Sequence, residues 1–330
     1  MSDADAQLDL FAAPRRAADR RLAERFEREH RECAAIAHRL PPRIFFGTSS
    51  WSYPEWAGLV YDRRASASVL AREGLAEYAR HPLLTTVGID RGFYAPIPQR
   101  DLEEYGRQLP PGFLCLTKAP AAVTDVVVRE GSSRRSNPDY LNASRFVDDM
   151  LGLFRASFSE HSGPFVLQFP PAPEGARPSP AEFAQALDRF MEELPGDLRY
   201  AVELREARLL TSEYGRVLAR RGVSHVYNLA TSMPLPAEQA EAIAPAAAFA
   251  VIRLLLPPSM RYEERRAALA PFDRIRDSDP ALRRQVAGLA SRLAGSGRDV
   301  FVLVNNKVEG CAPATIRALA ELLAGENVKT

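Results

Sequence analysis

Residues 44–56 read IFFGTSSWSYPEW, so that an apolar run passes directly into a loop of hydroxyls, aromatic rings and one carboxylate. The apolar run Ile44–Thr48 predicts a buried strand, and the amphipathic pattern of residues 66–80 predicts a helix after the loop. Connecting loops are usually built from Gly, Ser, Asn and Asp, so two indoles and a phenol are unusual here. We therefore expect this loop to line a site at the end of its strand.

The alternation of apolar strands with amphipathic helices continues to the end of the chain. The predicted strands are Ile44–Thr48, Leu83–Asp90, Phe113–Lys118, Phe165–Phe169, Tyr200–Leu204, Ser224–Leu229, Phe249–Leu254 and Val300–Asn305. The predicted helices are 66–80, 99–108, 139–157, 179–194, 211–221, 236–243, 261–293 and 313–324. Eight such units predict a (β/α)₈ TIM-type barrel with an extra N-terminal helix. A doubly wound sheet is the alternative, and it fits less well because the units fill the chain without a second domain.

Two segments lie outside the repeating barrel units. Residues 1–13 are polar and alanine-rich and predict a disordered tail, and residues 14–42 predict an amphipathic helix that ends at Pro41-Pro42. The barrel is expected to occupy residues 43–330. Within it, residues 119–138 form a long connection, which is typical of a lid or of a disordered loop.

Composition indicates a soluble, cytoplasmic protein. Of 330 residues, 46% are hydrophobic and 26% are charged, and the net charge of +1 argues against broad nucleic-acid binding, while a local basic patch stays open. Three scattered cysteines are too few for a disulfide framework, which fits a reducing compartment. The acidic N-terminus does not resemble a signal peptide, and no apolar run reaches the roughly 18 residues of a membrane span.

The carboxyl ends of the strands in such a barrel converge on one mouth. A polar group ends each predicted strand: Thr48-Ser49, Asp90-Arg91, Lys118, Gln168, Glu203 with Arg205, Asn228, Arg253 and Asn305-Asn306. Cations outnumber carboxylates in this set, which favours a small anionic ligand such as a phosphate, a sulfate or a carboxylate. The alternative is a set of ion pairs that only tie the strands together.

Two residues are the catalytic candidates. Glu203 could act as an acid or base, and Lys118 could be a nucleophile if it is desolvated near arginines, or could simply pair with Glu203. The substrate-binding candidates are Ser49, Trp51, Tyr53, Trp56, Asp90, Arg91, Tyr94, Gln168, Arg205, Arg253, Asn305 and Asn306. The indoles could instead seal the top of the barrel as a hydrophobic cover.

Metal and cofactor chemistry is not indicated by the sequence. None of the five histidines is expected at the mouth, so an imidazole-rich metal site lacks ligands, and no cofactor motif is present. Cys311 follows the last strand, and without a neighbouring histidine as base we expect a passive thiol.

An ordered series of motifs resembles the YecE-like family, a bacterial domain of unknown function with a barrel fold. The series spans about residues 43–325 and consists of residues 47–56, Phe93-Tyr94, Lys118-Ala119-Pro120, Gln168-Phe169-Pro170-Pro171, Ala201-Val202-Glu203-Leu204-Arg205, Arg253, Asn305-Asn306, Glu309-Gly310 and Pro313. The resemblance implies the fold and no particular activity.

The chain departs from the family pattern at potential proton-transfer groups. Gly88 stands where the family usually has Glu, Asp90 replaces an Asn, and Asp125 stands where a His often follows the third strand. Leu255 and Leu256 replace a His and a Gly. Either the aspartates compensate in an altered chemistry, or the pocket is kept and the reaction is lost.

A short apolar motif interrupts the polar tail. Gln7-Leu8-Asp9-Leu10-Phe11 resembles the motif by which bacterial replication and repair proteins bind the ring-shaped sliding clamp. The resemblance implies that four side chains enter a groove on the clamp: Gln7, Leu8, Leu10 and Phe11. The alternative is that these side chains pack on the protein's own barrel.

Two kinds of function follow from these observations. The first is a hydrolase or lyase that acts on a small anionic or nucleotide-like substrate without a cofactor. The second is a non-catalytic binding or adaptor protein recruited to the sliding clamp. Whether the protein is an enzyme, and whether it touches nucleic acid directly, stays open at this stage.

Overall fold

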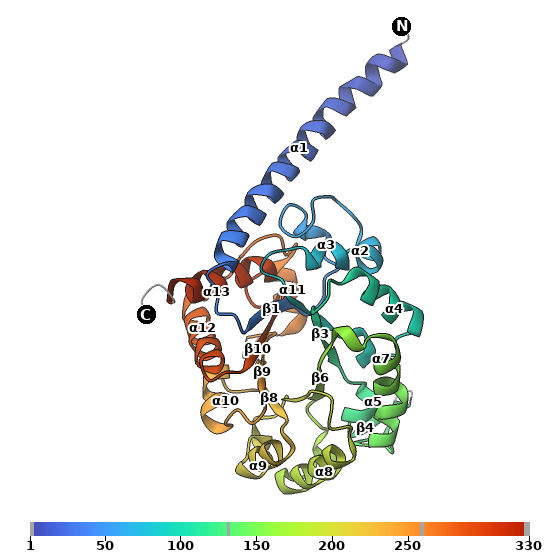
Figure 1. Ribbon diagram of the computed structural model, residues 1–330. Helices are drawn as coiled ribbons and strands as arrows, with labels where there is room; N and C mark the ends of the chain where they lie inside the picture. Colours follow the sequence, from blue (N-terminus) through green and yellow to red (C-terminus); the bar gives the residue numbers. More distant parts are fainter. Residues whose placement is uncertain (1–2, 131–132, 258–260, 327–330) are drawn as a thin grey trace.

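A computed structural model describes the backbone of residues 3–130, 133–257 and 261–326 and the side chains of residues 17–128, 134–257 and 261–325. The strands close into a parallel barrel in the order β1-β10-β9-β8-β7-β6-β3-β2, with helices around it (Figure 1). This confirms the predicted TIM-type barrel with an extra N-terminal helix and excludes the open doubly wound sheet.

All eight barrel strands overlap the strands expected from the sequence. They are β1 (Ile44–Thr48), β2 (Thr86–Ile89), β3 (Leu114–Lys118), β6 (Ser162–Phe169), β7 (Tyr200–Leu204), β8 (Ser224–Leu229), β9 (Phe249–Leu254) and β10 (Asp299–Val304). The register places Gln168 opposite Glu203 and Asn228 opposite Arg253. Polar strand-end residues therefore lie at one level, at the carboxyl end of the barrel.

The surrounding helices also match the sequence pattern closely. They are α2 (Ala67–Glu73), α3 (Leu75–Ala79), α4 (Gln99–Gln108), α6 (Ala143–Phe146), α7 (Gly152–Ser157), α8 (Pro180–Glu193), α9 (Ser212–Arg221), α10 (Pro236–Ala242), α11 (Tyr262–Leu269), α12 (Pro280–Gly295) and α13 (Ala312–Glu326). Local chemistry explains their ends: Ser179 and Glu182 form a capping box at the start of α8, and Gly222 ends α9 with a φ of +64°.

The long connection after β3 is not a structureless loop in its described residues. It contains a helical turn, α5 (Ala121–Thr124), and an antiparallel hairpin of β4 (Val127–Glu130) and β5 (Ser133–Ser136). The Asn137 side-chain amide donates to the carbonyls of Ala122 and Asp125, at 2.7 and 2.6 Å. These two hydrogen bonds fasten the base of the hairpin.

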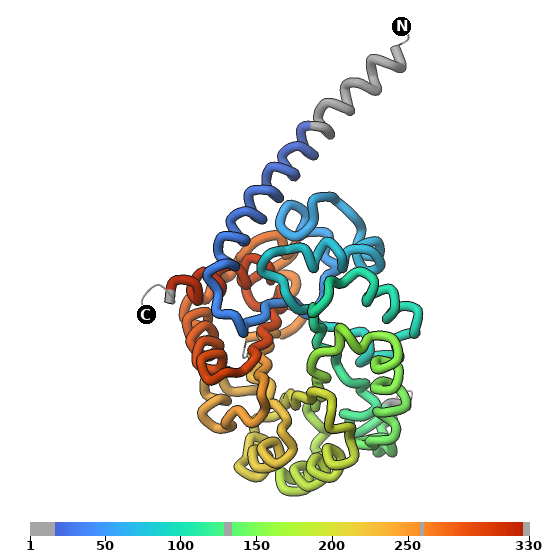
Figure 2. The backbone as a smooth tube through the Cα atoms, viewed as in Figure 1, coloured from blue at the N-terminus to red at the C-terminus, as the bar shows by residue number. Residues whose placement is uncertain are grey.

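The N-terminal helix α1 (Asp3–Ala37) begins earlier than the predicted start at residue 14 and projects from the barrel (Figure 1). Its C-terminal part is anchored: Cys33 and Ile36 are buried, and Arg317 of α13 pairs with Glu29 and Glu32. Figure 2 shows α13 in red beside this part of α1. The predicted tail 1–13, with Gln7, Leu8, Leu10 and Phe11, lies outside the residues whose side chains are described.

Within the described residues, no helix combines the length and apolarity needed to cross a membrane.

The close approach of β1 and β2 depends on Gly47. A Cβ built at this position would lie 2.1 Å from the backbone oxygen of Thr86. We expect Gly47→Ala to lower the free energy of unfolding by about 1–3 kcal/mol or more, because neither strand can move without opening the barrel. Urea denaturation would measure the loss. Gly196→Ala is the matched control, since its Cβ has no neighbour within 4 Å, and equal effects would contradict this account.

Candidate functional site

The centre of the barrel mouth is occupied by the carboxylate of Glu203, on β7. Its side chain is fully buried, and both oxygens accept hydrogen bonds from guanidinium groups. Arg253 of β9 donates from Nη1 to Oε2 at 2.7 Å, and Arg205, directly after β7, donates from Nε to Oε1 at 2.6 Å. A buried charge of this kind is tolerated only with such pairing.

The same two arginines extend the network to other strands. Arg253 Nη2 donates to the Asp90 carboxylate after β2, with distances of 2.9 and 3.2 Å to its two oxygens. Arg205 Nη2 donates to Gln168 Oε1 on β6 at 2.9 Å. We call these five residues, Asp90, Gln168, Glu203, Arg205 and Arg253, the mouth network. The structure thus brings together residues that are widely separated in the chain, as the strand-end pattern predicts.

The positive charges around Glu203 indicate that this carboxylate has a structural role. Burial alone would raise the pKa of Glu203, but Arg205, Arg253 and Lys118 outweigh burial and lower that pKa to about 2. A carboxylate that is permanently charged near neutral pH, with both oxygens engaged, is poorly suited to proton transfer. The geometry therefore favours the ion-pair interpretation of Glu203 over the predicted acid–base role.

Lys118, the last residue of β3, differs from the arginines of the mouth network in its lack of a charged partner in the part of the chain that the structure describes. Its side chain is only 7% exposed, and among the described residues its ammonium has no hydrogen-bond or ion-pair partner. Nζ lies 3.4 Å from the centroid of the Phe93 ring. Burial lowers the pKa of Lys118 to about 8; Arg253 and Arg205 act in the same direction as burial, against Asp90 and Glu203. The predicted alternative, a direct Lys118–Glu203 pair, is not formed, because the arginines occupy Glu203.

The indoles of the opening loop lie in the core. Trp51 is 6% exposed, donates from Nε1 to the Leu70 carbonyl at 3.0 Å and meets Tyr105 edge-on. Trp56 is fully buried and packs on Tyr53, with ring centroids 4.7 Å apart. These contacts agree with the alternative in which the indoles cover the barrel, because both rings are buried among other side chains.

Several predicted contact residues serve local structure. Arg91 pairs with Asp101 of α4 at 2.7 Å and so lies outside the mouth network. Asn306 Oδ1 accepts from the backbone N–H of Ala312 at 2.7 Å, at the start of α13. Ser49 is buried, and its hydroxyl has no hydrogen-bond partner within the described residues.

Two exposed tyrosines, Tyr94 and Tyr262, lie in segments that follow strand ends, and only Tyr94 was predicted from the sequence. Tyr94 and Tyr262 are 82% and 52% exposed, the two large hydrophobic residues that are exposed in the described chain. Lys307 Nζ lies 4.3 Å from the Tyr262 ring centroid and 3.2 Å from Oδ1 of Asn305. Tyr262 was missed because it begins α11 rather than ending a strand.

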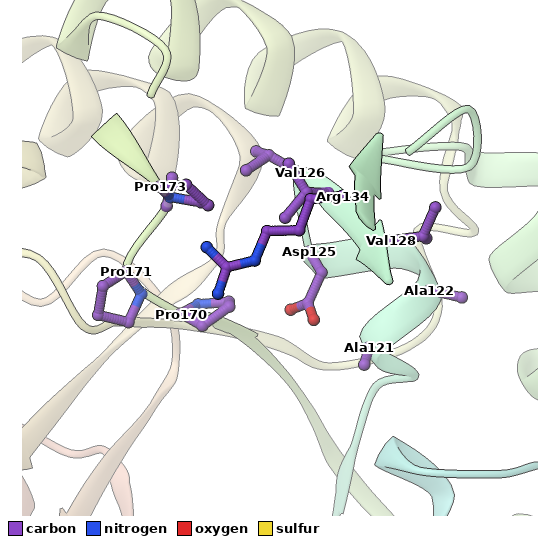
Figure 3. Close-up of a pocket in the computed structure, with 11 residues that line it drawn as sticks. Ala121, Ala122, Asp125, Val126, Val128, Arg134, Pro170, Pro171 and Pro173 are labelled. Carbon is purple, nitrogen blue, oxygen red and sulfur yellow. The ribbon is translucent and has the colours of Figure 1, made fainter. Parts of the chain in front are cut away.

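A cavity of about 620 Å³ lies between the β4–β5 hairpin and the segment after β6 (Figure 3). Its lining is mostly aliphatic: Ala121, Ala122, Val126, Val127, Val128, Pro170, Pro171, Ala172 and Pro173, with Asp125 and Arg134 as the charged members. Glu206 holds the proline segment by accepting the backbone N–H of Ala172 at 2.7 Å. Because the cavity is built on segments that directly follow β3 and β6, it lies on the same end of the barrel as Lys118.

Asp125 and Arg134 are the two charged residues on the cavity wall. The Asp125 carboxylate and the Arg134 guanidinium point into the space between hairpin and proline segment (Figure 3). Asp125 Oδ1 is buried without a hydrogen-bond partner in the described part of the chain. Burial raises the pKa of Asp125, and the charge of Lys118 acts in the opposite direction. Among the described residues, no three His, Cys, Asp or Glu side chains are grouped as metal ligands.

Comparison with known proteins places the chain among proteins without an assigned activity. Residues 45–330 match the family model described as "Protein of unknown function DUF72". A DUF72 family protein from Thermotoga maritima is 19% identical with a TM-score of 0.63, over 85% of this chain and 98% of that chain. One from Enterococcus faecalis is 15% identical with a TM-score of 0.58, over 87% and 96%. Such identities establish a common fold, and none of the curated proteins matches.

The structural role of Glu203 predicts how its mutation changes the stability of the protein. Glu203→Gln removes the carboxylate that pairs with Arg205 and one of the two that pair with Arg253 in a buried site, so we expect the free energy of unfolding to fall by about 3–5 kcal/mol. Chemical denaturation at pH 7 would measure this loss. Glu213→Gln removes an exposed partner of Arg216 and should leave stability nearly unchanged, because solvent screens such a pair. A Glu203→Gln protein as stable as that control would show that the network is dispensable.

Proposed function

The chain belongs to the DUF72 family, the YecE-like family that its motifs resemble, and we propose that its barrel mouth binds a small anionic substrate and acts on it as a hydrolase or lyase. The observation that carries this proposal is the uncompensated charge of Lys118. Arg205 and Arg253 face the carboxylates of Glu203 and Asp90, two against two. Lys118 therefore adds a positive charge that no side chain of the mouth network neutralises.

An anion would relieve that imbalance. A buried cation without a partner costs free energy, and a carboxylate or phosphate beside it recovers part of that cost through a charge-assisted hydrogen bond. The cavity on the same end of the barrel, at about 620 Å³, falls within the range of small-molecule sites. Arg134 supplies a second, exposed cation at its edge.

Catalysis, rather than binding alone, is supported by the perturbed protonation of two neighbouring groups. The pKa of Lys118 is lowered and that of Asp125 is raised, both principally by burial. Opposite shifts in two titratable groups close enough to influence each other are typical of acid–base or nucleophilic sites. Glu203 then has the task of holding the arginines in place.

Anion binding provides the test. We expect inorganic phosphate or sulfate, titrated at constant ionic strength, to shift the NMR signals of residues around Lys118. Lys118→Met should weaken this binding about tenfold or more, because a charged hydrogen bond is worth about 1.5–3 kcal/mol. Lys307→Met is the control, since that ammonium already contacts Asn305 and Tyr262. Equal binding by the wild type and Lys118→Met would overturn the proposal.

Recruitment to the sliding clamp is a second candidate function, independent of the mouth. It is supported by the way α1 leaves the barrel: its side chains from residue 17 to residue 24 are exposed or half-exposed, and burial begins only toward Cys33. A docking peptide at Gln7–Phe11 would then be carried on a projecting helix that a large ring-shaped partner could reach.

The clamp proposal is tested with purified proteins. The double variant Leu10→Ala, Phe11→Ala should lose clamp binding by about tenfold or more in surface plasmon resonance, because two apolar anchors are removed. The double variant Asp3→Ala, Asp5→Ala changes charge but leaves the motif intact and should bind like the wild type. Unchanged affinity in the first variant would contradict clamp binding through this motif.

A further inference from the structure

We propose that Lys118 acts as a neutral amine nucleophile and forms an imine with the carbonyl group of an anionic aldehyde or oxo acid. This inference rests on the proposed anion site and names the substrate class and the reactive atom, Nζ. It makes the protein a lyase-type enzyme whose covalent step takes place where β3 ends.

Composition is the first argument. Of the 43 Lys and Arg residues in the chain, only three are lysines: Lys118, Lys307 and Lys329. Arginine takes nearly every cationic position, including both cations of the mouth network. A guanidinium binds carboxylates and phosphates at least as well as an ammonium, and in two-point geometry. What an arginine cannot provide is a lone pair, because it does not lose its proton. Lysine at position 118 therefore indicates a need for the free amine.

The surroundings of Lys118 are the second argument. No described carboxylate or carbonyl accepts a hydrogen bond from Nζ, although the ring face of Phe93 favours the ammonium to a smaller extent. With its pKa lowered to about 8, roughly a tenth of the molecules carry a neutral amine at pH 7, against fewer than about one in a thousand for an ordinary lysine. Desolvation beside arginines is a recognised way to activate such an amine.

The cavity supplies the other parts of the reaction. The Nζ lone pair attacks the carbonyl carbon, the C=O electron pair moves to oxygen, and one proton passes from nitrogen to that oxygen to give a carbinolamine. Asp125 lies on the cavity wall and is close enough to Lys118 to be influenced by its charge. In the proposed step, protonated Asp125 donates its proton to the hydroxyl, which leaves as water. The products are an iminium ion on Lys118 and the Asp125 carboxylate. The amine and the carbinolamine are neutral, and a positive charge returns with the iminium ion, beside the substrate's anionic group.

Reductive trapping tests the inference directly. Pyridoxal 5′-phosphate serves as a probe, being an aldehyde that carries a phosphate, with sodium cyanoborohydride to convert the iminium into a stable secondary amine. Peptide mass spectrometry then reports each lysine and the N-terminus separately. We expect Lys118 to be labelled at least tenfold faster than Lys307 at pH 7. Because the neutral fraction grows with pH, the labelling rate should rise with a midpoint near pH 8 and then level off. An excess of inorganic phosphate should slow it.

Variants separate this inference from the proposed function. Lys118→Arg keeps the positive charge, so it should retain phosphate binding and lose the adduct, and Lys118→Met should lose both. Circular dichroism confirms folding, and if Lys118→Arg does not fold, phosphate protection and the pH profile of the wild type decide. Wild-type protein that binds phosphate but labels Lys118 no faster than Lys307 would overturn the imine and leave the anion site standing. Failure of phosphate binding as well would overturn both.

Discussion

A fully buried carboxylate held between two arginines is the constraint on which the barrel mouth depends. Glu203 has no exposure to solvent, and it remains charged because Arg205 and Arg253 each donate to one of its oxygens. Removing either partner would leave an uncompensated buried charge, which costs far more than the pair contributes. Since Arg253 also holds Asp90, and Arg205 also holds Gln168, one carboxylate fixes the relative positions of four strands.

The same pairing of carboxylates and arginines determines which of the described charged groups at the mouth stays unpaired. Once the two carboxylates and two arginines satisfy one another, Lys118 is the surplus group, buried and without a hydrogen-bond acceptor in the described residues. Burial is the main cause of the lowered pKa of Lys118; Arg253 and Arg205 act in the same direction, against Asp90 and Glu203. In the function proposed above, the tasks are therefore divided: the mouth network holds the strand ends together, and Lys118 and Asp125 are the groups that bind and react.

Much of the fold was predictable from the sequence, and the reasons are local. The bounds of β1, β7, β8 and β9 agree with prediction because each is a largely apolar run with a polar residue at its last or next-to-last position. The hairpin after β3 was missed because its strands are short and the second, Ser133–Ser136, is wholly polar and cationic. A π-helical turn at Val147–Leu151 divides one predicted helix, and periodicity alone does not reveal it.

The position of the candidate site could be predicted from the sequence, but the roles of its individual residues could be predicted less well. Strand-end reasoning correctly gathered Asp90, Lys118, Gln168, Glu203, Arg205 and Arg253, since parallel strands in a barrel must end at one mouth. Roles depend on partners that sequence spacing does not show. Arg91 forms an ion pair with Asp101 of α4, and Trp51 donates a hydrogen bond to the carbonyl of Leu70, so neither belongs to the mouth network. The cavity lining could not be anticipated, because it requires the hairpin that the sequence did not indicate.

The central claim, that Lys118 is a surplus amine with a lowered pKa, can be measured without knowing any substrate. The protein can be labelled with ¹³C at the Cε atom of lysine. Because the chain has only three lysines, their NMR signals can be resolved, and substituting one lysine at a time assigns each signal. We predict that Lys118 titrates near pH 8. A Lys118 signal that titrates near about pH 10.4, the value of an ordinary lysine in water, would contradict the account.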